Sequence, residues 1–152
     1  MSDASPARPD ITACRVLRVL LVDDNAADRE LAREVFQDHG VRVGIETCAS
    51  GRAALHTLRL PGAVLPDVIL LDLNMPGLSG FEVLEALKSD RHLSMLPVVI
   101  LTTSSDAQDV ERAYSLHAAS FMTKQLDFGR FVQQVDAFVN FWMHVRTTQW
   151  LS

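Results

Sequence analysis

Three short apolar runs without polar alternation limit most strongly what this chain can fold into. They are Val19-Leu20-Leu21-Val22, Val68-Ile69-Leu70-Leu71 and Val98-Val99-Ile100-Leu101. Strands of a parallel sheet have this pattern, because helices cover both of their faces and leave no side for polar residues. Two weaker segments complete the set, and the first of them suits a sheet edge. We therefore expect strands at 16–22, 41–48, 68–71, 98–101 and 120–123.

Helical patterns separate these segments. They span about residues 26–39, 52–60, 81–89, 107–116 and 128–146; Gly40 closes the first, and Asp127 is suited to cap the last. Strand and helix thus alternate five times, which predicts an α/β fold with a doubly wound, five-stranded parallel sheet. Ligands in such folds bind beyond the carboxyl ends of the strands, where the strand order reverses.

Polar and charged residues follow four of the predicted strands. Asp23 and Asp24 follow the first, Asp72 follows the third, and Thr102 and Lys124 follow the fourth and the fifth. Three carboxylates at one edge repel each other unless they share a cation, and an all-oxygen site suits a hard divalent ion such as Mg²⁺. The sequence therefore predicts a magnesium site at the carboxyl edge of the sheet, with a hydroxyl and an ammonium beside it.

This order of strand ends resembles the receiver domain of bacterial response regulators, over about residues 15–140. The resemblance implies the flavodoxin-like receiver fold, in which five strands alternate with five helices, and a role in a two-component system. Asp72 would accept a phosphoryl group from the phosphohistidine of a histidine kinase. The domain would then signal by a change of conformation and interface. It would assist its own phosphorylation and dephosphorylation without being an enzyme that acts on another substrate.

The resemblance also implies the ligands of the metal ion. Asp24, the Asp72 carboxylate and the backbone carbonyl of Asn74 would bind Mg²⁺ directly, and Asp23 would hold it through water. The chemistry agrees with this assignment, because a carboxylate can attack a phosphoryl group only when the negative oxygens of the donor are neutralised. Mg²⁺ together with an ammonium provides that neutralisation.

The phosphoryl oxygens would be bound by Lys124 and Thr102 in the same resemblance, and Phe121 would follow the movement of Thr102. Two positions depart from the family pattern. Gln125 follows the lysine where the family has proline after a cis bond, so the loop before the last helix is expected to differ. Thr103 stands where the family more often has a very small residue. We expect its larger side chain to narrow the access to the phosphoryl group, for a phosphodonor and for the water that dephosphorylates Asp72.

Two other functions use similar elements. A phosphatase of the haloacid dehalogenase type also has a strand-end aspartate and magnesium, but it needs an acid-base aspartate where this chain has Asn74. A flavin-binding flavodoxin-like module would need amides and hydroxyls after the first strand to hold an anionic phosphate. This chain has Asp23, Asp24 and Asn25 there, which disfavours that reading.

Composition sets the remaining limits. The net charge of −5 and the scattered basic residues disfavour nucleic-acid binding. Cys14 and Cys48 lack the spacing of a zinc site or a disulfide framework, so both thiols are expected to be reduced and the protein cytoplasmic. No segment suits a membrane span or a signal peptide. We expect a flexible extension at 1–14, one receiver domain at 15–146 and a short tail at 147–152.

The last helical segment carries more apolar residues than one buried face requires. We expect Phe138, Phe141, Trp142 and Trp150 to form a homodimer interface, with the alternative that the tail folds back on its own domain. The aromatic tail and the longer loops at 60–66 and 91–96 resemble regulators that act with bacterial phytochrome kinases. A histidine kinase of that kind is therefore the expected partner.

Overall fold

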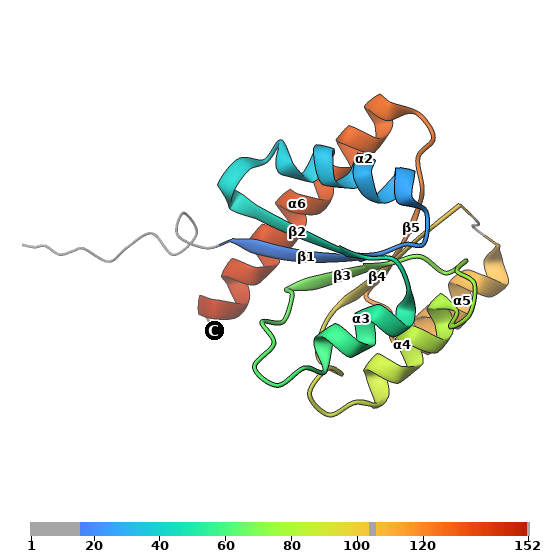
Figure 1. The fold of residues 1–152 in the computed structure, drawn as a ribbon. Coiled ribbons are helices and arrows are strands. Elements are labelled where there is room, and N and C mark those ends of the chain that lie inside the picture. The colour runs from blue at the N-terminus through green and yellow to red at the C-terminus, as the bar shows by residue number, and fades with distance from the viewer. Residues whose placement is uncertain (1–15, 104–105, 152) are drawn as a thin grey trace, which may run out of the picture.

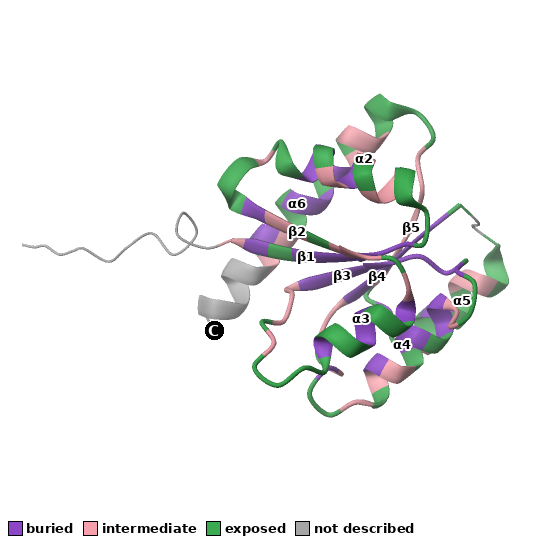
Figure 2. Ribbon diagram, viewed as in Figure 1, coloured by how far each residue is buried: buried purple, intermediate pink, exposed green. Residues whose placement is uncertain are grey.

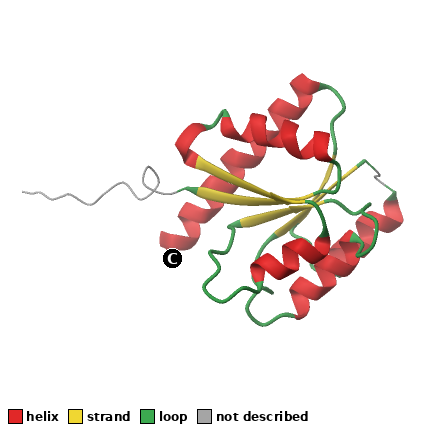
Figure 3. Ribbon diagram, viewed as in Figure 1, coloured by secondary structure: helices red, strands yellow, loops and turns green. Residues whose placement is uncertain are grey.

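The computed structural model describes residues 16–103 and 106–151, with side chains described as far as Val145. Five parallel strands form one sheet in the order β2-β1-β3-β4-β5, and helices cover both of its faces (Figure 1). Strand and helix alternate along the chain, as Figure 3 shows. The predicted doubly wound α/β fold is confirmed. The strands are β1 Leu17–Val22, β2 Val43–Cys48, β3 Val68–Leu71, β4 Val98–Thr102 and β5 Ser120–Thr123.

The two helical layers differ in their number of helices. α2 (Ala26–Gln37) and α6 (Phe128–Leu151) pack on one face, and α3 (Gly51–Leu58), α4 (Gly80–Ser89) and α5 (Ala107–Ser115) pack on the other. β3 and β4 are buried along their whole length, as unbroken apolar runs require, whereas β2 and β5 are only partly buried at the edges (Figure 2). The apolar runs thus identified the central strands correctly.

Three strand boundaries differ from the prediction, and the first strand begins one residue late, at Leu17. The second strand begins at Val43 rather than at residue 41, because Gly40–Arg42 form a 3-10 turn that starts from Gly40 at a φ of 68°. The fourth strand extends by one residue to Thr102, which pairs with Thr123 of β5. Thr102 is therefore fixed by the sheet instead of belonging to the loop that follows it.

The start of α4 is packed tightly against the loop after β3. Ser79 caps the helix in a reciprocal pair with Glu82, and the Gly80 amide donates to the carbonyl of Leu73 at 3.1 Å. A Cβ atom at Gly80 would lie 2.4 Å from the carbonyl oxygen of Asp72. Only glycine permits this approach, so the sequence around Gly80 fixes α4 directly beside Asp72.

α6 is longer than predicted, since it continues past residue 146 to Leu151. Its inward residues, Val135, Phe138, Val139 and Met143, lie in the core formed with α2 and β1. Phe138 is 5% exposed and meets Phe36 edge to face at 5.8 Å. The expectation that Phe138 belongs to an exposed interface is therefore wrong. Among the described residues, no helix is both long and apolar enough to cross a membrane.

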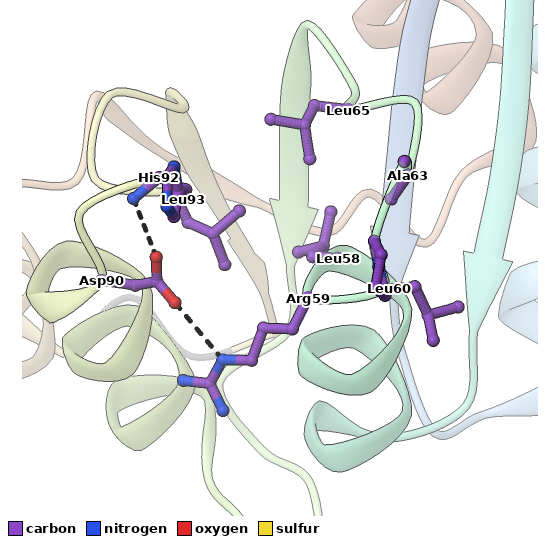
Figure 4. A pocket seen from close by; sticks show the side chains of 10 residues that line it. Leu58, Arg59, Leu60, Ala63, Leu65, Asp90, His92 and Leu93 are labelled. Carbon is purple, nitrogen blue, oxygen red and sulfur yellow. Dashed lines mark hydrogen bonds and ion pairs between the residues drawn. The ribbon is translucent and has the colours of Figure 1, made fainter.

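The longer loops after α3 and α4 meet at the amino edge of the sheet. They enclose a pocket of about 510 Å³ with leucines on its walls (Figure 4). Arg59 and Asp90, the residues that end α3 and α4, form an ion pair at 3.4 Å across one side of it. Asp90 also accepts a hydrogen bond from the backbone of His92 at 2.9 Å. This partly exposed ion pair therefore joins the ends of α3 and α4.

Candidate functional site

Three carboxylates gather at the carboxyl edge of the sheet, where β1 and β3 lie side by side. The register pairs Val22 with Leu71, so the residues that follow them, Asp23 and Asp72, leave the sheet together. One oxygen each of Asp23, Asp24 and Asp72 lies within 4.8 Å of the others. Asp23 and Asp72 are 1% and 5% exposed, whereas Asp24 faces solvent. The predicted cluster is thus present, at the point where the strand order reverses.

Burial makes the charge on Asp72 costly. Loss of solvent raises the pKa of the Asp72 carboxyl above its ordinary value, and the neighbouring charge of Asp23 adds to the rise. The backbone amide of Asn74, which donates to Oδ1 at 3.1 Å, and the Lys124 ammonium offset only part of it. A cation beside Asp72 would therefore lower the free-energy cost of its buried charge.

Lys124 supplies the central positive charge of the site. Its Nζ lies 2.8 Å from Asp23, 2.9 Å from Asp28 and 3.5 Å from Asp72. Burial alone would lower the pKa of Lys124, but the hydrogen bonds to Asp23 and Asp28 outweigh it and raise the pKa well above its ordinary value. The lysine is therefore charged at any physiological pH.

Thr102 and Asn74 close the other side of the cluster. The Asn74 side-chain amide donates to Oγ1 of Thr102 at 2.9 Å, and Thr102 is completely buried. Phe121, on β5, is partly buried against the core on the α3–α5 face. The structure thus brings Thr102 to the same edge as the carboxylates. Its hydroxyl accepts from Asn74, the residue whose backbone carbonyl is expected to bind the metal ion.

Asp28 is a residue of this site that sequence reasoning missed. It lies in the first turn of α2, where its backbone amide is capped by Asn25 at 3.0 Å. Its carboxylate binds Lys124, which is 96 residues away in the sequence. The available signal was its place in the first turn of the helix that follows Asp23 and Asp24, but an acid in a first helical turn is also common without any partner.

The donor set fits a divalent metal ion. All three clustered side chains offer carboxylate oxygens, which suit Mg²⁺ or Mn²⁺ better than softer metals. Burial, and to a smaller extent the charge of Asp23, raises the pKa of Asp72 despite the nearby Lys124. Because Asp24 is exposed, ligands from solvent also have access. A bound divalent cation would neutralise the cluster and orient oxygens of a substrate.

The two departures from the family pattern both lie at the rim of the site. The Gln125 side chain donates to the carbonyl of Thr123 at 3.4 Å and does not enter the carboxylate cluster. Thr103 is exposed, directly after the buried Thr102. Gln125 also lines a small pocket with Asp23, Asp28 and Lys124.

A separate apolar groove lies between α6 and the β4–β5 edge, with a volume of about 600 Å³. Phe141 borders it and is 57% exposed, and Trp142 meets Phe141 edge to face at 5.1 Å. Trp150 was also expected at this surface, but its side chain lies outside the described residues. The structure thus leaves Phe141 and part of Trp142 available to a partner.

Comparison with known proteins agrees with the fold and the site. Residues 19–136 match the model of the response regulator receiver domain family. The chain is 40% identical over 128 residues to the probable methanogenesis regulatory protein FilR2 of Methanothrix harundinacea, covering 82% of this chain and 83% of that protein. It is 35% identical over 133 residues to the response regulator Rcp1 of Synechocystis, covering 85% and 90%.

Solved structures give the same result. The phosphorylated cyanobacterial phytochrome response regulator RcpA superposes with a TM-score of 0.78 at 37% identity, covering 84% of this chain and 94% of that one. The Mn²⁺-bound form of Rcp1 superposes with a TM-score of 0.75 at 35% identity, covering 83% and 94%. The arrangement of strand-end residues described above therefore occurs in a chain whose relatives include phosphorylated and metal-bound proteins.

Proposed function

Because the chain belongs to the response regulator receiver family, we propose that Asp72 is the residue on which it accepts a phosphoryl group. The protein is a phosphoacceptor of two-component signalling and not a classical enzyme. One observation carries the assignment to Asp72. It is the buried carboxylate that lies beside Lys124 without a short bond to it, at 3.5 Å, whereas Asp23 is held at 2.8 Å.

The transfer is a displacement at phosphorus. An oxygen of Asp72 forms a bond to the phosphorus as the phosphorus–nitrogen bond of a donor phosphohistidine breaks, and the electron pair returns to the imidazole. Lys124 stabilises the charge on the phosphoryl oxygens, and the pocket supplies position rather than covalent chemistry.

Mg²⁺ is the proposed cation. By the family resemblance, Asp24, the Asp72 carboxylate and the carbonyl of Asn74 would bind it directly and Asp23 would hold it through water; the three carboxylates lie close enough together to share one ion. Support comes from the all-oxygen donor set and from the Mn²⁺ bound to Rcp1, a cation with similar ligand preference. When bound, the cation neutralises the carboxylates and the incoming phosphoryl oxygens.

Thr102 and Phe121 form the proposed switch. The Thr102 hydroxyl accepts a hydrogen bond from the side-chain amide of Asn74 at 2.9 Å, and its own O–H would donate to a phosphoryl oxygen. Phe121 is only partly buried, so it has room to follow. The new phosphoryl group brings close to two negative charges, which is enough to bias such a small rearrangement.

The rival functions find less support. The haloacid dehalogenase reading needs an acid-base group at Asn74, but the Asn74 amide is engaged with Thr102. The flavin reading needs donors for a phosphate after β1, but Asp23 and Asp24 stand there as acceptors. Both readings therefore conflict with the chemistry of individual side chains.

A histidine kinase of the bacterial phytochrome type is the proposed partner. The receiver domain that it would phosphorylate is proposed to span residues 15–146 of this chain. Support comes from similarity to RcpA, which is a phytochrome response regulator. We also place a homodimer contact at the groove beside α6, where a second copy would cover Phe141 and Trp142. Phe138 supports this surface from the core beneath it.

The phosphoacceptor is tested with acetyl phosphate and Mg²⁺, followed by mass spectrometry of the intact protein. The parent should gain one phosphoryl group and Asp72→Asn should gain none, because its amide cannot attack phosphorus. Asp38→Asn, which removes an exposed carboxylate at the end of α2, is the matched control and should behave as the parent. Labelling that persists in Asp72→Asn contradicts the assignment.

The dimer is tested by sedimentation of Phe141→Asp. A charge at this exposed position should yield a monomer that still accepts phosphate, whereas Phe128→Asp alters an equally exposed aromatic on the same helix and should stay dimeric. A substitution is preferable to truncation after Asn140, which would remove Met143 from the core. A monomeric parent at high micromolar concentration rules out the contact.

A further inference from the structure

Asp28 lies outside the three-carboxylate cluster yet holds the same ammonium. Lys124 has three N–H donors, and its two shortest contacts go to Asp23 at 2.8 Å and Asp28 at 2.9 Å. Asp72 is the more distant carboxylate, at 3.5 Å. The ammonium is therefore held closer to α2 than to the residue that accepts the phosphoryl group.

The position of Asp28 is set by α2 itself. Asn25 caps the helix by accepting from the Asp28 amide, and Asp23 fixes that cap by accepting from the Asn25 amide at 2.9 Å. Arg29, next along the helix, donates to the carbonyl of Asp23 at 2.8 Å. The carboxylate of Asp28 is thus presented to Lys124 by a helix start that is bonded to the site.

Asp23 and Asp28 differ in how readily they can release the lysine. The Asp23 side chain is 1% exposed, so without Lys124 its carboxylate would lose a charge partner in a place that water does not reach. The Asp28 side chain is 43% exposed, so water can take over its hydrogen bonds. Of the two short contacts, the one to Asp28 costs less to break.

We propose that Asp28 is a positioning residue that competes with the phosphoryl group on Asp72 for the Lys124 ammonium. Before phosphorylation, Asp28 holds Lys124 toward α2. When a phosphodonor binds, its phosphoryl oxygens replace Asp28 as the partner of Lys124, and the freed carboxylate turns to solvent. This inference rests on the proposed role of Asp72. It goes further because it names a residue that weakens binding of the phosphodonor. The contact of this residue with Lys124 also links α2 to the phosphorylation state of Asp72.

Kinetics with acetyl phosphate test the sign of the effect. Removing the competitor with Asp28→Asn should lower the acetyl phosphate concentration at half-maximal rate about two- to fivefold, the effect of a partly exposed ion pair, and leave the maximal rate unchanged. Asp28→Glu restores a carboxylate and should return toward the parent. Glu30→Gln removes an exposed acid from the same helix away from Lys124 and should leave both constants unchanged.

A spectroscopic reading on the metal-free protein separates competition from a general loss of structure. The Lys124 side-chain ammonium and its neighbouring carbon should shift in NMR spectra of Asp28→Asn but not of Glu30→Gln. After addition of Mg²⁺ and beryllofluoride, a mimic of the phosphoryl group, the spectra of Asp28→Asn and the parent should converge at Lys124. Signals that stay apart would show that Asp28 keeps the lysine and overturn the proposal.

The outcomes distinguish this inference from the proposed function. If Asp72→Asn is labelled as fully as the parent, the phosphoacceptor assignment fails and this inference fails with it. Suppose that the parent is labelled, that Asp72→Asn is not, and that Asp28→Asn has an unchanged or higher half-saturating concentration of acetyl phosphate. The proposed competition is then wrong, and the role of Asp72 stands. An unchanged Lys124 spectrum in Asp28→Asn likewise overturns the competition alone.

Discussion

The two edges of the sheet each hold charged residues joined across separate loops, but the charges are balanced at only one of them. At the amino edge, one arginine meets one aspartate in the Arg59–Asp90 pair. At the carboxyl edge, Lys124 is shared by Asp23, Asp28 and Asp72, and Asp24 adds a fourth carboxylate. The surplus of negative charge marks the edge that needs a cation from solution.

The difference is also visible in how each aspartate titrates. At the amino edge, the hydrogen bond from His92 and then the contact with Arg59 lower the pKa of Asp90 below its ordinary value. At the carboxyl edge, burial raises the pKa of Asp72. One carboxylate is thus stabilised as an anion by its surroundings, and the other is not. An ion pair alone does not identify a functional site, whereas a buried carboxylate with a raised pKa beside other ionised groups is typical of one.

The largest expected effect comes from removing the one ammonium of the acidic edge. Lys124→Ala should lower the free energy of unfolding by about 3 kcal/mol without metal, because buried carboxylates lose their counter-ion. Mg²⁺ should restore part of this loss. Urea unfolding in EDTA and in Mg²⁺ measures both, with Lys88→Ala as a lysine control away from the cluster. Equal stability of the parent and Lys124→Ala in EDTA would show that the charges at this edge are already compensated.

Metal binding gives the next largest effect. At a Mg²⁺ concentration 100 times the dissociation constant, the parent should gain about 2.7 kcal/mol of stability. Asp24→Ala should fold normally, because Asp24 is exposed, but should gain little from Mg²⁺. Thermal unfolding over a Mg²⁺ series measures the gain. A parent that gains nothing, or a variant that gains as much, would exclude Asp24 as a ligand.

Acid titration compares the two edges directly. Asp72 stabilises the fold in its protonated form. This contribution is complete below the pKa that Asp72 has in the unfolded chain, and it is lost as pH rises through the raised pKa that Asp72 has in the folded protein. Asp72→Asn should therefore be more stable than the metal-free parent at neutral pH, by about 1 kcal/mol, and the difference should vanish in acid. Unfolding midpoints between pH 3 and 7 measure it. A lower stability at pH 7 would mean that Asp72 is well compensated.

The smallest effect, of opposite sign, is expected at the amino edge. Asp90 stabilises the fold in its ionised form. This contribution is present above the pKa that Asp90 has in the unfolded chain, and it is lost as pH falls through the lowered pKa that Asp90 has in the folded protein. Asp90→Asn should therefore be slightly less stable than the parent at neutral pH and equal to it in acid. The same pH series measures this, and phosphorylation should not change. Opposite pH trends for Asp72→Asn and Asp90→Asn would sharpen the contrast, and parallel trends would remove it.

The residues of the acidic edge were predictable because topology decides them. A residue that follows a parallel strand must lie at the carboxyl edge, so Asp23, Asp72, Thr102 and Lys124 were placed from the pattern of strands alone. Asp28 was not, because its contact depends on the angle at which α2 leaves the strand. The Arg59–Asp90 pair was missed for a similar reason, since it joins two loops whose shape no periodicity describes.

The error at Phe138 has a different origin. Apolar residues surround much of α6, so the pattern does not show which side of the helix faces the core. Packing against Phe36 selects the face that contains Phe138 and leaves Phe141, three residues later, exposed. Sequence reasoning identified the presence of an apolar surplus on this helix but not the direction in which it points.

The contact between Gly80 and Asp72 has a mechanical consequence. The Gly80 amide donates to the carbonyl of Leu73 at 3.1 Å, and a Cβ at residue 80 would lie only 2.4 Å from the Asp72 carbonyl, so the loop and the start of the helix are in direct contact. A displacement of the Asp72 backbone by a fraction of an ångström must be shared by the start of α4. Ser79 and Glu82 lock that first turn internally, so the turn moves as a rigid body. α4 is thereby the element whose outer surface can report a strain that originates at Asp72.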